Sequence, residues 1–127
     1  MTGYLDNIEK LTLENDFFRK VLYTGQHAQL VVMALKPNES IGQEVHEIVD
    51  QFFRVEAGEG KLILEGEERE VSDGDAFIVP AGTQHNVVNT SSEASLKLYT
   101  VYSPPHHKDG IIHKTKLEAE SDTKDHI

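Results

Sequence analysis

Two separated stretches of the sequence carry side chains that can bind a metal ion. The first contains Glu44 and His46 and is followed by Gln51, and the second contains His85. Together they offer a carboxylate oxygen, two imidazoles and an amide oxygen. Such donors suit Zn(II), Mn(II), Fe(II), Ni(II) and Co(II), and the bound ion would act as a Lewis acid or polarise a water molecule. We therefore predict a divalent metal site at these four residues.

Each of these side chains also has an interpretation without metal. Glu44, His46 and Gln51 would then form a polar network in which the groups satisfy one another inside an empty barrel. His85 would be a buried histidine that is hydrogen-bonded to the backbone. A Glu44 that does not bind the ion could instead move a proton during catalysis.

The geometry of β-strands predicts how these side chains come together. Residues two apart on a strand share a face, so Glu44 and His46 project together. Gln51 has the wrong parity for the same strand, so a turn must intervene, and Gln51 would begin the next strand and face His46 across a hairpin. The bend at residues 80–82 would end one strand and aim His85 from the next.

Tyr102 is the second candidate catalytic residue, after Glu44. It is in phase with Leu98 and Thr100, which predicts that it faces the interior, where its hydroxyl could act as an acid or anchor a substrate. Packing in the core is the simpler alternative. Phe53 and Val55 share the parity of Gln51 and should line the same cavity.

Three further histidines, His106, His107 and His113, could form a second metal site. No predicted strand fixes their geometry, so we expect them to lie in a solvated loop.

Short strand-forming runs, separated by Gly and Pro, position these residues. The predicted strands cover residues 28–35, 51–56, 61–65, 66–71 (a hairpin around Gly66), 76–79, 86–89 and 96–102. This spacing favours an antiparallel sandwich or barrel. We expect an N-terminal arm or strand over residues 1–25, a barrel over 26–103 and an extension over 104–127, whose last part is a short helix or frayed.

Composition excludes several functions. The 127 residues include no cysteine, so disulfides and thiolate sites are absent and a reducing cytoplasm is the simplest compartment. The net charge of −10 argues against nucleic-acid binding. No signal peptide or membrane-spanning run is evident. Eight carboxylates gather between residues 56 and 75, which we interpret as a solvated hairpin face.

The spacing of both stretches resembles the two motifs of the cupin superfamily. Gly74 to Asn89 reads G-x5-P-x-G-x2-H-x3-N. The usual first motif is G-x5-H-x-H-x3,4-E-x6-G; this chain has Asn38, Glu44, His46, Gln51 and Gly58 at its five fixed positions. The resemblance implies an all-β fold, a double-stranded β-helix or jelly-roll barrel. It also implies metal ligation by His46 and His85, and a Gln in the third ligand position occurs in some metal-binding cupins, including ones that resemble uronate-metabolism enzymes.

The chain also resembles small bacterial cupins that are often labelled mannose-6-phosphate isomerase-like. This implies an enzyme with isomerase- or lyase-type Lewis-acid chemistry on a small polar or sugar-derived metabolite; a non-catalytic ligand-binding or sensing cupin is the alternative. Basic residues near the motifs are few, which argues against phosphorylated sugars. Small cupins often pair through edge strands, so we expect a homodimer with its contact near Phe17 and Phe18.

Overall fold

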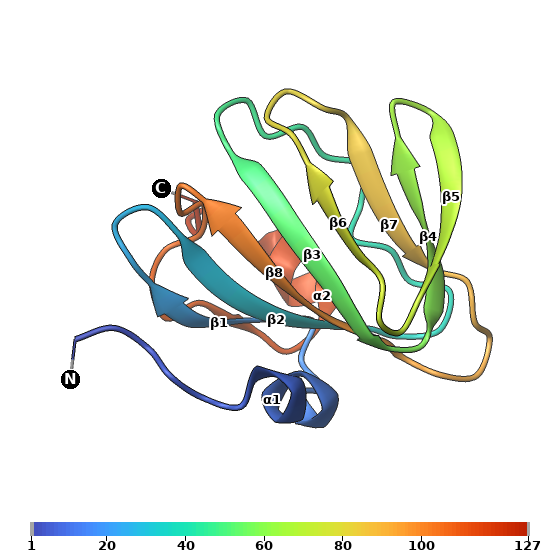
Figure 1. Ribbon diagram of the computed structural model, residues 1–127, viewed down its shortest axis with the longest axis horizontal. Coiled ribbons are helices and arrows are strands. Elements are labelled where there is room, and N and C mark those ends of the chain that lie inside the picture. Colours follow the sequence, from blue (N-terminus) through green and yellow to red (C-terminus); the bar gives the residue numbers. More distant parts are fainter. Residues whose placement is uncertain (1, 127) are drawn as a thin grey trace.

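The computed structural model describes residues 2–126 and forms a barrel from two antiparallel sheets (Figure 1). One sheet has the order β6-β3-β8-β2-β1-β9 and the other β5-β4-β7. The strands are β1 (Arg19–Thr24), β2 (Gln29–Leu35), β3 (Asp50–Ala57), β4 (Glu59–Leu64), β5 (Glu67–Ser72), β6 (Ala76–Val79), β7 (His85–Asn89), β8 (Leu96–Ser103) and β9 (Ile112–His113). The helices are α1 (Ile8–Glu14) and α2 (Lys116–Ser121). Neither helix of this described part has the length and apolar character needed to cross a membrane. The predicted all-β class is confirmed.

Strands β3 and β8 form the wall that carries several of the predicted site residues. Burial alternates along both strands, as expected when one face of a sheet packs on the core. Gln51 pairs with Tyr102, and Phe53 pairs with Thr100. Tyr102 is 2% exposed, and Phe53 and Val55 are fully buried. The predicted inner face of both strands is confirmed.

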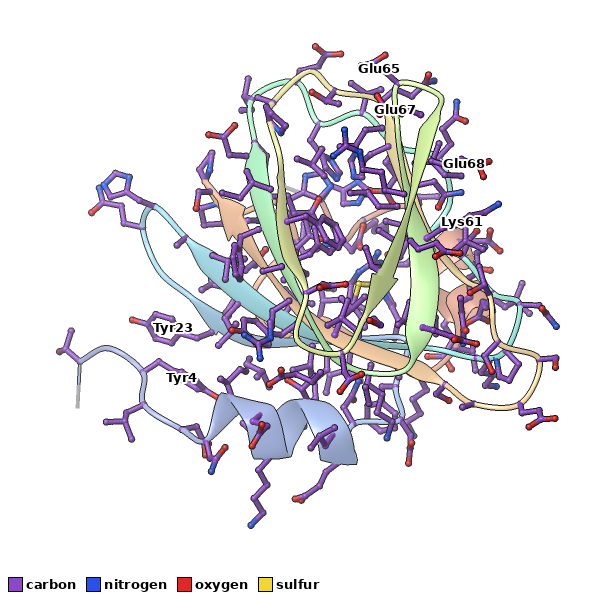
Figure 2. The ribbon with its side chains drawn as sticks, turned by 45° about the vertical axis from the view of Figure 1, so that its right-hand side comes forward. Tyr4, Tyr23, Lys61, Glu65, Glu67 and Glu68 are labelled. Atoms are coloured by element: carbon purple, nitrogen blue, oxygen red, sulfur yellow. The ribbon has the colours of Figure 1, made fainter. Side chains whose placement is uncertain are left out.

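The hairpin of β4 and β5 explains the acidic stretch. Leu64 pairs with Glu67, which leaves Glu65 and Gly66 as a two-residue loop with φ angles of 48° and 82°. Two successive positive φ values are the geometry of a type I′ turn, whose twist matches that of the strands. Figure 2 shows the side chains of Glu65, Glu67 and Glu68 at the outer edge of this hairpin, and all three residues are exposed. The solvated acidic face is confirmed here.

The segment 40–46 pairs with β7 and thereby joins the two motifs. The Glu44 amide donates to the His85 carbonyl at 2.9 Å, and the His85 amide donates back at 2.9 Å. The expected hairpin, with Gln51 facing His46 from a strand paired to this segment, is wrong. Both edges of β3 are already occupied, by β6 and β8, so the segment crosses to the smaller sheet.

The N-terminal helix packs against the barrel. Asn7 caps α1 by accepting a hydrogen bond from the Lys10 amide at 3.0 Å, and α1 contacts β2, β3 and β8. Phe18 is 3% exposed and packs in the core of its own chain, whereas Phe17 is half-buried. Phe17 is therefore the ring that retains surface for a second copy, and the homodimer stays a prediction.

The segment after β8 buries two of its three histidines, so the expected solvated loop is wrong for them. His107 and His113 are 2% and 3% exposed. The cause is Gln29 of β2, whose side-chain oxygen accepts from the amides of His106 and His107 at 3.1 and 2.9 Å. Its amide nitrogen donates to the His107 carbonyl at 2.7 Å. The chain then returns after α2 and forms a bridge between His107 and His126.

Candidate metal centre

Glu44, His46 and His85 converge inside the barrel. One ligand atom from each of the three lies within 4.8 Å of the other two. The ring centroids of His46 and His85 are 5.4 Å apart. The backbone bridge between Glu44 and His85 positions them, and His46 follows two residues later on the same face. The predicted convergence of these three side chains is what the geometry shows.

His85 presents a bare nitrogen to this centre. Its Nδ1 lies 3.0 Å from the Thr83 carbonyl oxygen, which can only accept a hydrogen bond, so Nδ1 carries the proton. The Nε2 lone pair is therefore free, and it is buried with no hydrogen-bond partner in residues 2–126. Burial lowers the pKa of His85, which keeps the ring neutral. A histidine oriented in this way by a backbone carbonyl is typical of a metal ligand.

Gln51 has an unpartnered oxygen as well. Its amide nitrogen donates to the Thr100 hydroxyl at 3.0 Å, and that hydroxyl donates to the Phe52 carbonyl at 2.8 Å. This chain fixes which way the amide points. The Gln51 Oε1 atom is buried and accepts no hydrogen bond from the described residues. An unsatisfied buried acceptor costs about 1–3 kcal/mol, so its retention points to a ligand that the protein alone does not supply.

His46 and Glu44 complete the set of donors. His46 Nε2 lies 2.9 Å from Glu44 Oε2, but the geometry of this contact is not that of a hydrogen bond. This nitrogen is therefore the third buried atom of the centre, after His85 Nε2 and Gln51 Oε1, that has no hydrogen-bond partner in the described chain. Burial favours a higher pKa for Glu44, but His46, Arg19 and His85 outweigh it and lower the pKa below its ordinary value. Glu44 is therefore ionised at neutral pH.

These residues fit a divalent metal ion. Metal–nitrogen bonds of about 2.0–2.1 Å place two ligand atoms at most about 4.2 Å apart, so a group already within 4.8 Å closes on an ion with small side-chain movements. One ionised carboxylate beside two imidazoles and an amide gives a charge that complements a dication. Imidazole and oxygen donors match the first-row ions predicted from the sequence.

Tyr102 lies beside the centre and links it to the returning C-terminal segment. Its ring centroid is 5.9 Å from that of His46. Its hydroxyl is 3.1 Å from Nε2 of His107, whose Nδ1 is 2.9 Å from Asp125. Burial raises the pKa of Tyr102, so the hydroxyl keeps its proton. Sequence reasoning missed Asp125 and Arg19, which lie 3.9 Å apart and are both buried; no motif contains them.

A wide hollow of the surface lies elsewhere. About 760 Å³ in volume, it is lined by residues of the β4–β5 hairpin such as Lys61, Glu68 and Arg69, and Figure 2 shows Lys61 and Glu68 on this outer side. It includes none of the centre's ligand residues. Its lining charges include ion pairs such as Lys61–Glu68 at 3.1 Å. The centre instead holds buried atoms that have no hydrogen-bond partner in the described part of the chain, so the centre is the stronger candidate.

Residues 31–102 match a family model described as the cupin domain. The chain belongs to the cupin family. The crystal structure of BH2720 from Bacillus halodurans aligns with this cupin at a TM-score of 0.91 and 42% identity, covering 94% of both chains. The structure of KdgF from Halomonas sp. aligns at a TM-score of 0.63 and 30% identity, covering 68% of this chain and 77% of that one.

A further relative is an uncharacterised protein, YrkC of Bacillus subtilis (strain 168). It is 44% identical over 123 residues, which cover 91% of this cupin but only 65% of YrkC. The chain thus spans somewhat less than two thirds of that relative. These likenesses confirm the cupin fold and the jelly-roll barrel. They do not assign a reaction to this cupin, and the mannose-6-phosphate isomerase-like subgroup stays a prediction.

Proposed function

We propose that this cupin is an enzyme that holds a divalent metal ion with Glu44, His46, Gln51 and His85. Its reaction would be of the isomerase or lyase type, on a small polar or sugar-derived metabolite. The observation that carries the proposal is a set of three buried atoms, on His46, Gln51 and His85, that can bind a metal and have no hydrogen-bond partner within residues 2–126. When bound, the ion would supply Lewis-acid polarisation of a hydroxy-carbonyl substrate.

The chain's own residues would hold the ion and move the proton. Thr83 fixes the His85 ring, and Thr100 fixes the Gln51 amide, so both donors are preorganised. Glu44 is ionised, and its side chain is 29% exposed, so one carboxylate oxygen can bind while the other accepts a proton from the substrate. Tyr102 would anchor the inner end of the site.

One observation favours a non-catalytic ligand-binding or sensing role as the second candidate. General acid–base chemistry usually needs a pair of groups, but the Tyr102 hydroxyl is buried, bonded to His107 and raised in pKa. Glu44 is then the one proposed proton carrier with exposed surface. In either role we expect a small-molecule ligand, a homodimer and a cytoplasmic location.

The test combines metal content with turnover. Bound metal is measured in four purified proteins: wild type, Glu44→Ala, His85→Ala and the control His27→Ala. His27 is an exposed residue outside the barrel interior. Metal-loaded samples are then incubated in D₂O with aldoses, ketoses and hydroxy acids and followed by proton NMR. We expect wild type and the control to exchange or convert at least one compound, and we expect His85→Ala to bind less metal than either and to convert none.

Two other outcomes are informative. Metal content that is unchanged in both Glu44→Ala and His85→Ala would remove the proposed centre. Binding of a compound, seen as line broadening, without exchange or conversion in the wild type would replace the enzyme by the ligand-binding alternative.

A further inference from the structure

A second group of imidazoles lies at the end of the barrel where the C-terminal segment returns. His106, His107 and His126 each offer one ligand atom, and these atoms all lie within 4.8 Å of one another. The ring centroids are 4.8 Å apart for His106 and His107, 4.3 Å for His106 and His126, and 5.3 Å for His107 and His126. His107 is buried, His106 is half-buried and His126 is exposed, so the group reaches from the interior to solvent.

A buried carboxylate orients two of the three rings. Asp125 is 2% exposed; its Oδ2 lies 2.9 Å from His107 Nδ1, and its Oδ1 lies 3.1 Å from His126 Nε2. A carboxylate that binds the outer nitrogen of an imidazole fixes the ring and directs its other nitrogen at a metal. Arg19, 3.9 Å from the same carboxylate, balances its charge.

The inner nitrogen of this group is satisfied when no cation is present. His107 Nε2 lies 3.1 Å from the Tyr102 hydroxyl, which donates to it. A hydroxyl can rotate about its C–O bond, so a cation that arrives from the solvent side has only to displace this one hydrogen bond.

We propose that His106, His107 and His126 form a second metal site, which takes Zn²⁺ or a similar borderline ion. A donor set of three imidazoles without a carboxylate selects Zn²⁺, Ni²⁺, Cu²⁺ or Co²⁺ over Mg²⁺, Ca²⁺ and Mn²⁺. Because His126 is exposed, a water molecule would serve as the fourth ligand. His113, which the sequence placed in this group, instead contacts Asp122 at 3.0 Å and Arg19 at 3.4 Å.

The two sites are neighbours but share no ligand. The ring centroids of His46 and His106 are 4.3 Å apart, and His106 belongs to the second group only. The second site therefore does not rest on the function proposed for the first, and each can be removed separately.

The experiment counts zinc ions in paired variants. The experiment compares four full-length proteins: wild type, His126→Ala, His85→Ala and the control His27→Ala. Each protein is stripped of metal with a chelator, loaded with Zn²⁺ and desalted, and its zinc content per chain is then measured by mass spectrometry. We expect about two zinc ions per chain in the wild type and the control, and about one in each of the other variants. Melting temperatures would verify that all variants are folded.

The outcomes separate the two sites. A wild type with one zinc that is lost in His126→Ala but kept in His85→Ala supports the second site and contradicts the first. A wild type with one zinc that is kept in His126→Ala overturns the second site. The same question can be answered without any variant, because zinc-soaked crystals with no anomalous peak between His106, His107 and His126 would also overturn it.

Discussion

Relative to the usual cupin motif, the carboxylate among the donors has changed position. The position that normally holds the acidic ligand is Gln51 here, and the position of the first histidine is Glu44. One imidazole is thereby exchanged for an amide, but the donor set keeps a single negative charge. The carboxylate also moves from a strand interior to a residue whose side chain is partly exposed, where it can meet a substrate.

Gln51→Leu tests whether Gln51 is a ligand rather than a structural residue. Its Oε1 has no partner in the described residues, so the loss of that oxygen breaks no hydrogen bond. The Thr100 hydroxyl loses the hydrogen bond that it accepts from Gln51 but still donates to Phe52. We expect the free energy of unfolding without metal to stay within about 1 kcal/mol of wild type. Zinc affinity should fall at least about tenfold. Urea unfolding in EDTA and calorimetric titration measure the two quantities.

Gln29→Leu is the matched control. Gln29 is equally buried, but both ends of its amide are hydrogen-bonded, to Thr24, His106 and His107. Its loss should cost at least about 3 kcal/mol because several backbone groups are left unsatisfied. A Gln51→Leu protein that is as unstable as this control would mean that Gln51 serves the fold and not a ligand.

At the scale of elements, the sequence predicted the strands whose burial alternates. Strands β3 and β8 and the β4–β5 hairpin follow from period-2 patterns and turn residues. The sequence does not distinguish strand β1 from the N-terminal arm. Arg19 is charged but buried, and a charge at a buried position conceals the alternation of polar and apolar residues that is typical of a strand. Its burial depends on Asp125 and His113, about a hundred residues away, and no local pattern encodes that contact.

The same limit applies to the sites. Glu44, His46 and His85 were predictable because fixed spacings place them on strand β7 and on the segment that pairs with it. His126 was not, since its contact with His106 depends on α2 and on the way the chain returns to the barrel. The C-terminal segment thus has to be understood as a part of the barrel wall and not as a tail.

Asp125→Ala tests that element. The change leaves Arg19 buried without its nearest carboxylate and removes the hydrogen bond that orients His107. We expect a loss of about 3–5 kcal/mol in the free energy of unfolding. The control Asp16→Ala breaks the contact with Lys97 on the surface, where the Asp16 side chain is 85% exposed, and should cost less than about 1 kcal/mol. Equal, small losses in both would show that residues 122–126 do not stabilise the barrel.

For the whole molecule, acid has two opposing effects on stability. The chain carries a net charge of −10, so protonation of surface carboxylates relieves repulsion, but they titrate mostly below about pH 5. Several histidines are buried in neutral form. Burial and neighbouring charges lower the pKa of His106 from 6.5 to about 4, and they also lower the pKa of His85 and His107. The histidine effect therefore acts first as the pH falls.

The metal-free protein should lose stability as the pH is lowered from about 6.5 to about 5. A histidine whose pKa is lower in the folded state binds its proton first in the unfolded chain, so the stability present above pH 6.5 declines as the pH approaches the folded value. We expect a loss on the order of 1–2 kcal/mol after allowance for solvent screening of the half-buried His106. Urea unfolding in EDTA at several pH values measures it. His106→Gln should reduce the slope and His27→Gln should not, because His27 is exposed; stability that rises over this range would mean that the net charge dominates the buried imidazoles.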